Sequence, residues 1–180
     1  MNNLKRIKKV SRGFHLFFSV LIVVVPLYYV FYWAFINQFP ETLITVNIDS
    51  NSLISNPLSI GLRLIGFLTS LLPLSALIYG LINIRKLFSY YRNGVIFSFD
   101  HVNIFKKTSK ALISWVFLSI FYESAKSILF SMGNPPGQRV VSVGFSSQEI
   151  TTLVVAGIFC IIAWVMDEGR IITEEQKLTV

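Results

Sequence analysis

The chain has 180 residues, of which 53% are hydrophobic and only 14% are charged, and its formal net charge is +7. Soluble globular proteins carry about 25% charged residues, so the composition excludes an ordinary soluble domain and indicates a membrane protein, in which an ionised side chain within the bilayer costs about 2.5–3.5 kcal/mol. The basic residues lie beside apolar runs, which favours anionic lipid headgroups as their partner over direct binding of nucleic acid.

The first predicted membrane helix covers residues 14–36 and follows a basic head that contains no acidic residue. Its apolar run exceeds the roughly 7–15 residues of a signal-peptide core, and no A-x-A-like cleavage site follows, so we expect an uncleaved helix. Pro26 lies near its centre and should kink it. Aromatic residues gather toward its far end, as they do at a membrane interface: Tyr28, Tyr29, Tyr32 and Trp33.

The second predicted helix covers residues 58–93 and follows a polar outer loop, in which residues 42–48 have the composition of a short strand. The apolar run ends near Ile84, but Leu87, Phe88 and Tyr91 continue the helical spacing. This helix should therefore leave the membrane and continue for about two turns. Gly94 predicts its end, because glycine accepts the left-handed conformation of a helix cap.

The third predicted helix covers residues 99–132, with Ser98 as its N-cap and Asp100 in its first turn, where a negative charge suits the helix dipole. A turn rich in glycine and proline ends this helix at residues 133–137. In the second outer loop, residues 139–143 have the composition of another short strand. The fourth predicted helix covers about residues 150–168 and is long enough to cross a bilayer.

These elements predict an all-α membrane protein with one polytopic domain over residues 1–180. Two hairpins of transmembrane helices would be joined by an elbow, residues 85–110, into which helices two and three extend. The outer loops contain a single basic residue, Arg139, so the positive-inside rule predicts that head, elbow and tail are cytoplasmic. The basic residues of the elbow are Arg85, Lys86, Arg92, Lys106, Lys107 and Lys110.

Two short segments of the predicted cytoplasmic side resemble DUF2975, a family of bacterial membrane proteins of unknown function. One is similar to the Gly-x-x-Phe-Ser elbow of the family, and the other to its C-terminal signature, although Ile171-Ile172 departs from the usual leucine spacing. The resemblance implies four membrane helices in the bacterial inner membrane with both termini cytoplasmic, and it implies no reaction. It also suggests a helix-turn-helix regulator as a cytosolic partner. The similar residues are Gly94-Val95-Ile96-Phe97-Ser98-Phe99-Asp100 and Glu168-Gly169 with Glu175 and Leu178-Thr179-Val180.

Three ionisable residues fall within the predicted spans: Arg63, Glu123 and Lys126. Glu123 and Lys126 are three residues apart and therefore share a helix face. An ionisable group inside a membrane is by default a functional-site hypothesis, so Glu123, lying between Arg63 and Lys126, could hold an ion or an anionic ligand or relay a proton. The alternative is a structural ion pair in which Lys126 extends to the interface.

The other polar residues predict no chemistry. Cys160 is alone in an apolar run, and neither His15 nor His101 has a second ligand at metal-binding spacing. The sequence contains no glycine-rich phosphate loop and no visible partner for a nucleophilic serine. We therefore expect no catalytic residue, no metal and no cofactor, and we expect that the protein is not an enzyme.

The leading functional expectation is a non-enzymatic accessory or regulatory subunit that docks a cytosolic or membrane partner through elbow and tail. The tail is expected to fold back, with its apolar residues packed on Phe88, Phe97 or Phe105. The alternative is a small transporter or channel subunit that uses Arg63, Glu123 and Lys126, and a homo-oligomer fits either function. A polar cavity at Glu123 that opens to one side would favour transport, and a sealed ion pair would favour the subunit. The candidate partner-binding residues are Arg85, Lys86, Arg92, Phe97, Ser98, Asp100, Glu168, Gly169, Glu175, Leu178, Thr179 and Val180.

Overall fold

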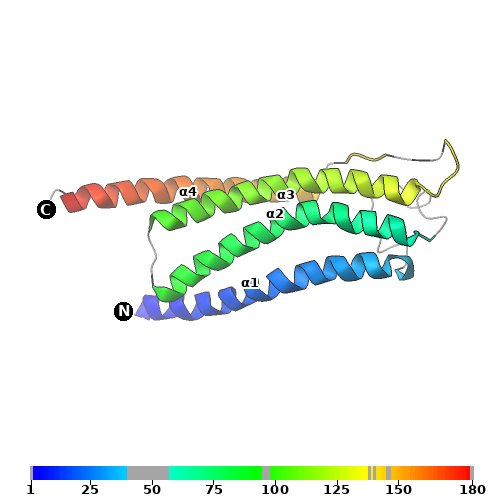
Figure 1. The fold of residues 1–180 in the computed structure, drawn as a ribbon. Helices are drawn as coiled ribbons and strands as arrows, with labels where there is room; N and C mark the ends of the chain where they lie inside the picture. The colour runs from blue at the N-terminus through cyan, green and yellow to red at the C-terminus, as the bar shows by residue number, and fades with distance from the viewer. Residues whose placement is uncertain are drawn as a thin grey trace.

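The computed structural model describes residues 2–39, 57–94, 98–137, 139, 141–144 and 147–178, without the side chains of residues 2, 3, 170 and 173–178. Most of these residues are helical, and none of them lies in a strand. The helices are α1 (Asn2–Phe35), the short 3-10 helix η1 (Ile36–Gln38), α2 (Ile60–Asn93), α3 (Phe99–Ser131) and α4 (Ser147–Leu178) (Figure 1).

Each of these four α-helices is long and apolar enough to cross a membrane, which confirms the prediction of a multi-pass, all-α membrane protein. Two of the predicted boundaries are wrong. α1 begins at Asn2 and not near residue 14, because the basic head contains no proline and the single glycine, Gly13, does not interrupt the helix. α4 begins at Ser147 and continues to Leu178, about three turns beyond the predicted end at residue 168.

The predicted strands gain no support. The segment 42–48 lies outside the described residues. In the second loop, residues 139 and 141–144 have no regular secondary structure. The backbone N–H of Ser142 donates instead to the hydroxyl of Ser127 on α3, at 3.0 Å. This part of the loop is therefore bonded to a helix side chain and not to a strand partner.

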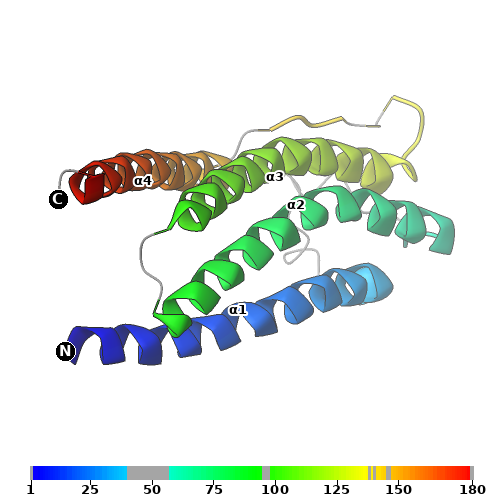
Figure 2. The same cartoon turned by 60° about the vertical axis from the view of Figure 1, so that its left-hand side comes forward.

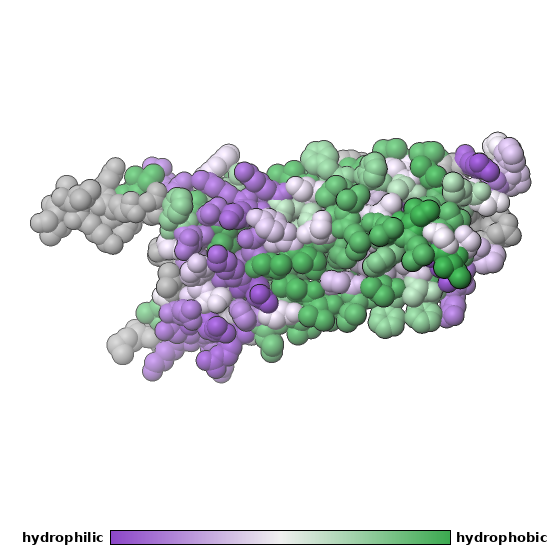
Figure 3. All heavy atoms as spheres, in the orientation of Figure 1, coloured by the Kyte–Doolittle hydropathy of each residue, from purple (hydrophilic) through white to green (hydrophobic). Residues whose placement is uncertain are grey.

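The helices pack in the order of the sequence, α1 on α2, α2 on α3 and α3 on α4 (Figure 2). α1 and α4 make no extensive contact with each other, so the described helices form an open, curved layer and not a closed bundle. Large apolar side chains on all four helices face outward, including those of Leu27, Leu68, Phe117 and Val165. Figure 3 shows an apolar band between two more hydrophilic ends on the face in view, as expected of a surface that faces lipid.

The two ends of the layer have different contents. We call one the terminal end, because it holds both chain termini and the α2–α3 turn, and the other the loop end (Figure 1). A core cluster near the loop end includes Trp33 of α1, Tyr122 and Phe130 of α3 and Leu58 before α2. A second cluster toward the terminal end is made of Leu87, Ile104, Phe105 and Ala163, from α2, α3 and α4.

The α2–α3 turn has the caps that the sequence predicts. Gly94 follows α2 with φ 83°, and its N–H donates to the carbonyls of Tyr90 and Tyr91. Ser98 is the N-cap of α3 in an extended conformation. Its hydroxyl makes no bond to the helix backbone and lies 2.6 Å from Nδ1 of His101. The positions of both caps are thus confirmed, but the Ser98 hydroxyl contacts His101 and not the backbone of α3.

Candidate functional site

Glu123 and Lys126 form an ion pair on α3. Nζ of Lys126 donates to Oε1 of Glu123 at 2.7 Å and also lies 5.5 Å from the centre of the Tyr122 ring. The lysine side chain is 5% exposed, whereas that of Glu123 is 25% exposed. The lysine is therefore held against the carboxylate, as expected of the structural ion pair that was the alternative. Helical spacing alone brings the two residues together, which is why this contact was predictable from the sequence.

Arg63 is not part of this pair, so the predicted group of three is wrong. Its Nε donates to the carbonyl of Leu58 at 3.1 Å, and Nη1 donates to the carbonyl of Ala34 at 3.3 Å. Carbonyls at the end of a helix have no partner within that helix, and a guanidinium offers five donors. Arg63 therefore ties the end of α1 to the start of α2, where Asn37 also bonds to the N–H and C=O of Leu58.

A cavity of about 260 Å³ opens beside the ion pair, and we call it the tyrosine cavity. Its walls come from three helices, and most of the groups that face it are polar. Gln148 is the second residue of α4, so the cavity lies level with the start of that helix, toward the loop end. Its lining residues are Tyr28, Tyr29 and Tyr32 of α1, Tyr122, Glu123 and Lys126 of α3, and Gln148 of α4.

Sequence reasoning missed this cavity. It identified Tyr28, Tyr29 and Tyr32 as aromatic residues of the interface, but not their convergence on Glu123. That convergence requires α1 to face α3, where the rings of Tyr29 and Tyr122 are 6.5 Å apart. The sequence did contain a signal for it. Three tyrosines lie at helical spacing on one membrane helix, and another membrane helix of the protein carries a carboxylate.

At the terminal end the structure places most of the predicted partner-binding residues on the surface. Lys86, Arg92, Asp100, Glu168 and Gly169 are exposed, whereas Arg85 and Ser98 are partly buried. Three others, Phe97, Thr179 and Val180, lie outside the described residues, and so do the side chains of Glu175 and Leu178.

The tail does not fold back on the elbow, which corrects the sequence-based expectation. α4 continues as a helix to Leu178 and extends past the ends of α2 and α3 (Figure 1). Ile171 is 40% exposed and Ile172 is 48% exposed. Two of the three expected partners contact other aromatic rings, because Phe88 stacks on Phe14 at 4.9 Å and Phe105 lies 5.8 Å from Phe159, while Phe97 lies outside the described residues.

One expected contact between elbow and tail is present. Nζ of Lys106 on α3 donates to Oδ2 of Asp167 on α4 at 3.1 Å. Both side chains are partly exposed to solvent, and pairs of this kind contribute about 0.2–1 kcal/mol. The basic elbow and the acidic start of the tail thus lie within reach of each other, but this ion pair fixes the tail only weakly.

His101 is a feature of the elbow whose role the sequence did not indicate. It is fully buried, and its ring lies 5.2 Å from that of Tyr90 and 5.1 Å from that of Tyr91. The hydroxyl of Tyr90 donates to Oδ2 of Asp100 at 3.0 Å. With the Ser98 contact, these interactions link the last turn of α2 to the first turn of α3 and hold the elbow in one shape.

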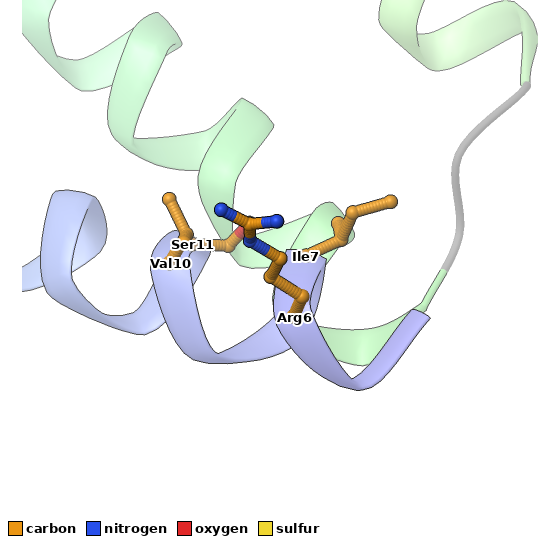
Figure 4. A pocket seen from close by; sticks show the side chains of 4 residues that line it. All are labelled: Arg6, Ile7, Val10 and Ser11. Carbon is orange, nitrogen blue, oxygen red and sulfur yellow. The ribbon is translucent and has the colours of Figure 1, made fainter. Parts of the chain in front are cut away.

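A further cavity, of about 440 Å³, lies along the start of α1 at the terminal end. Figure 4 shows its lining side chains, Arg6, Ile7, Val10 and Ser11, on successive turns of α1 beside the end of α2. Among the described residues that line it, all come from α1 and only Arg6 is charged. Among the described residues, no group of three His, Cys, Asp or Glu side chains gathers where it could hold a metal ion.

Comparison with known proteins identifies a family. The model of the family described as "Protein of unknown function (DUF2975)" matches residues 8–180, almost the whole chain. No curated protein and no solved structure matches the chain. The elbow and tail segments, on which the resemblance was first based, both lie within the matched range. The chain therefore belongs to the DUF2975 family of proteins of unknown function.

Proposed function

We propose that this protein is a non-enzymatic accessory or regulatory subunit of the bacterial inner membrane that docks a cytosolic partner at its terminal end. The observation that carries the proposal is the extension of α4. The apolar run of this helix ends at Met166, but the helix continues to Leu178. The extension presents Ile171 and Ile172, which are exposed outside the membrane span. Exposed apolar residues rimmed by polar ones are typical of protein–protein contact sites.

The charge of the terminal end supports the orientation that the proposal needs. Figure 3 shows hydrophilic residues gathered at this end, next to the apolar band (Figure 3). The basic residues of the head and elbow lie on α1, α2 and α3, and basic segments next to membrane spans are retained in the cytoplasm. In this arrangement two hairpins are joined by a cytoplasmic elbow, both termini are inside, and anionic lipid headgroups contact the basic residues.

Orientation can be tested by labelling single cysteines in a Cys160→Ala background. Cysteines at Asn51 and Gly137 are expected to react with a membrane-impermeant maleimide in intact cells. Cysteines at Asn103 and Gln176 are expected to react only after permeabilisation, because the basic bias places them inside. Labelling of Asn103 from outside would contradict the proposed orientation.

Partner docking can be tested with a photo-crosslinking amino acid at Ile172, with Trp164 of the same helix as the matched control. Trp164 is also exposed but lies within the apolar span. Position 172 is expected to yield a discrete adduct with a cytosolic protein, in an amount at least tenfold greater than at position 164. Deletion of residues 173–180 should abolish this adduct without removing the protein from the membrane. Equal adducts from the two positions, or adducts with lipid alone, would contradict docking at the tail.

The second candidate function is a small transporter or channel subunit. The polar cavity beside Glu123 favours it, since a sealed ion pair would have argued against it. The separation of Arg63 from Glu123 weakens it, because the pair that remains is electrically neutral. Protein-dependent uptake of choline into proteoliposomes that is lost in a Glu123→Gln, Lys126→Met variant would favour transport over the regulatory function.

A further inference from the structure

We infer that the tyrosine cavity binds the ammonium group of a small organic cation or of a lipid headgroup. The inference does not depend on the proposed regulatory function, because it concerns the loop end of the molecule and not the terminal end. It deepens the second candidate function, which uses the same cavity. It rests on the arrangement of the rings, on the exposure of the carboxylate and on the position of the lysine that is already bound there.

The first argument is the arrangement of the rings. The rings of Tyr28 and Tyr29 are 5.8 Å apart and nearly perpendicular, at 86°. Tyr28 and Tyr32 are 6.2 Å apart, and Tyr29 and Tyr122 are 6.5 Å apart. Four rings at different inclinations around one space present several π-faces and edges to its contents. The face of an aromatic ring attracts an ammonium cation, and aromatic cages recognise quaternary ammonium groups such as that of choline.

The second argument is the distribution of charge. Lys126 also lines the cavity, but its ammonium is buried and bonded to Oε1 of Glu123, so its charge is offset by that of the carboxylate. The Glu123 side chain is the more exposed partner at 25%, and a carboxylate has acceptor sites beyond the one that Lys126 uses. An anion entering the cavity would meet this carboxylate. A cation would meet it favourably and would also be attracted by the rings.

Lys126 itself shows that the site suits an ammonium group. Its Nζ lies both against a carboxylate at 2.7 Å and over a tyrosine ring at 5.5 Å. The remaining space, next to Tyr28, Tyr29 and Tyr32, offers a second cation the same two kinds of contact. We therefore expect the ligand to bind on the α1 side of the cavity. There its ammonium would contact a carboxylate and a tyrosine ring, as the ammonium of Lys126 does on the α3 side.

Size and depth restrict the ligand further. A volume of about 260 Å³ is below the roughly 300–1,000 Å³ of sites for drug-sized molecules, so it fits a headgroup and not a whole lipid. Gln148 lies just before the apolar stretch of α4, which places the cavity at the depth of the membrane interface. The ammonium could therefore come from a phosphatidylethanolamine headgroup or from a free solute such as choline.

The experiment is a titration of the full-length protein in detergent with choline chloride, read by calorimetry against potassium chloride at equal ionic strength. Saturable binding of choline and not of potassium is expected. Tyr28→Leu should weaken it about 3- to 30-fold, because one ring face is lost. Tyr28→Phe should stay within about threefold of the parent, since the ring remains. Tyr79→Leu is the matched control, because Tyr79 is also exposed but does not line the cavity, and it should change nothing.

A second variant tests the carboxylate without leaving a charge unpaired. Glu123→Gln combined with Lys126→Met is expected to remain folded, as judged by size-exclusion chromatography, and to bind choline at least tenfold more weakly. Choline affinities that are unchanged in both Tyr28→Leu and this double variant would overturn the inference, and so would tighter binding of inorganic phosphate than of choline.

The two sources are separated in nanodiscs. If choline binds equally in discs of phosphatidylglycerol and of phosphatidylethanolamine, the ligand is a free solute. If phosphatidylethanolamine discs abolish choline binding, the lipid headgroup occupies the site. The absence of saturable choline binding in detergent, together with equal thermal stability in the two kinds of disc, would show that the cavity takes no ammonium group and would overturn the inference.

Discussion

Replacing Gly66 by alanine is expected to lower the free energy of unfolding by about 1–3 kcal/mol or more, which is the cost of overpacking a filled core. Gly66 lies on α2 directly against the indole of Trp33, and a Cβ built on it would overlap the indole ring. The indole cannot withdraw easily, because it is buried and stacks on Phe130 with ring centres 6.3 Å apart. Unfolding in detergent, followed by tryptophan fluorescence, measures the loss.

Gly157→Ala is the matched control, since a Cβ at this position of α4 would meet nothing within 4 Å. This variant should unfold within about 0.5 kcal/mol of the parent, as surface substitutions usually do. Combining Gly66→Ala with Trp33→Leu should recover part of the stability by removing the clash. If the two glycine variants lose the same amount, the close approach of α1 and α2 at Gly66 is not what stabilises this end of the molecule.

Glu123→Ala is expected to be the other severe change, with a loss of about 3–5 kcal/mol. The substitution leaves the ammonium of Lys126 without its carboxylate, and the lysine side chain is 5% exposed. Removing one partner of a buried pair is costly because the other charge remains buried and uncompensated. The expected result is a reduced yield of folded protein and a lower midpoint of thermal unfolding in detergent.

Two double variants show whether this explanation is correct. Glu123→Ala with Lys126→Met should recover most of the loss, because no charge is stranded. Glu123→Ala with Arg63→Ala should instead be additive within about 0.5 kcal/mol, since Arg63 bonds to the carbonyls of Leu58 and Ala34 and not to the carboxylate. Recovery by Arg63→Ala and none by Lys126→Met would show that Arg63 is the true partner of Glu123.

The parts of the fold that were predictable are those that local chemistry decides. Composition indicated four membrane helices, and glycine's tolerance of positive φ placed the end of α2 at Gly94. Glu123 and Lys126 were paired correctly because their spacing within one helix brings them together. The start of α1 and the end of α4 were missed because polar helix formers can extend a membrane helix without any signal in the hydropathy.

The parts that were not predictable depend on how the helices are rotated and shifted against one another. The approximate depth of Arg63 suggested a contact with Glu123, but depth does not say which way a side chain points around its helix axis. The tyrosine cavity was missed for the same reason, because it exists only where Tyr29 of α1 meets Tyr122 of α3. Likewise, the contacts of Phe88 with Phe14 and of Phe105 with Phe159 join different helices, which spacing within one helix does not reveal.

The packing of each helix on its neighbour in sequence determines how the protein can be made. When α2 emerges during synthesis it already has α1 to pack on, and α3 and α4 each meet a finished partner in the same way. The contacts of α1 with α3, at Tyr29 and Trp33, form only once α3 has emerged, but contacts between neighbouring segments form fastest and come first. The last helix joins at an edge of the layer and does not return to α1 to close it. Assembly in the membrane can therefore proceed at the pace of translation, one helix at a time.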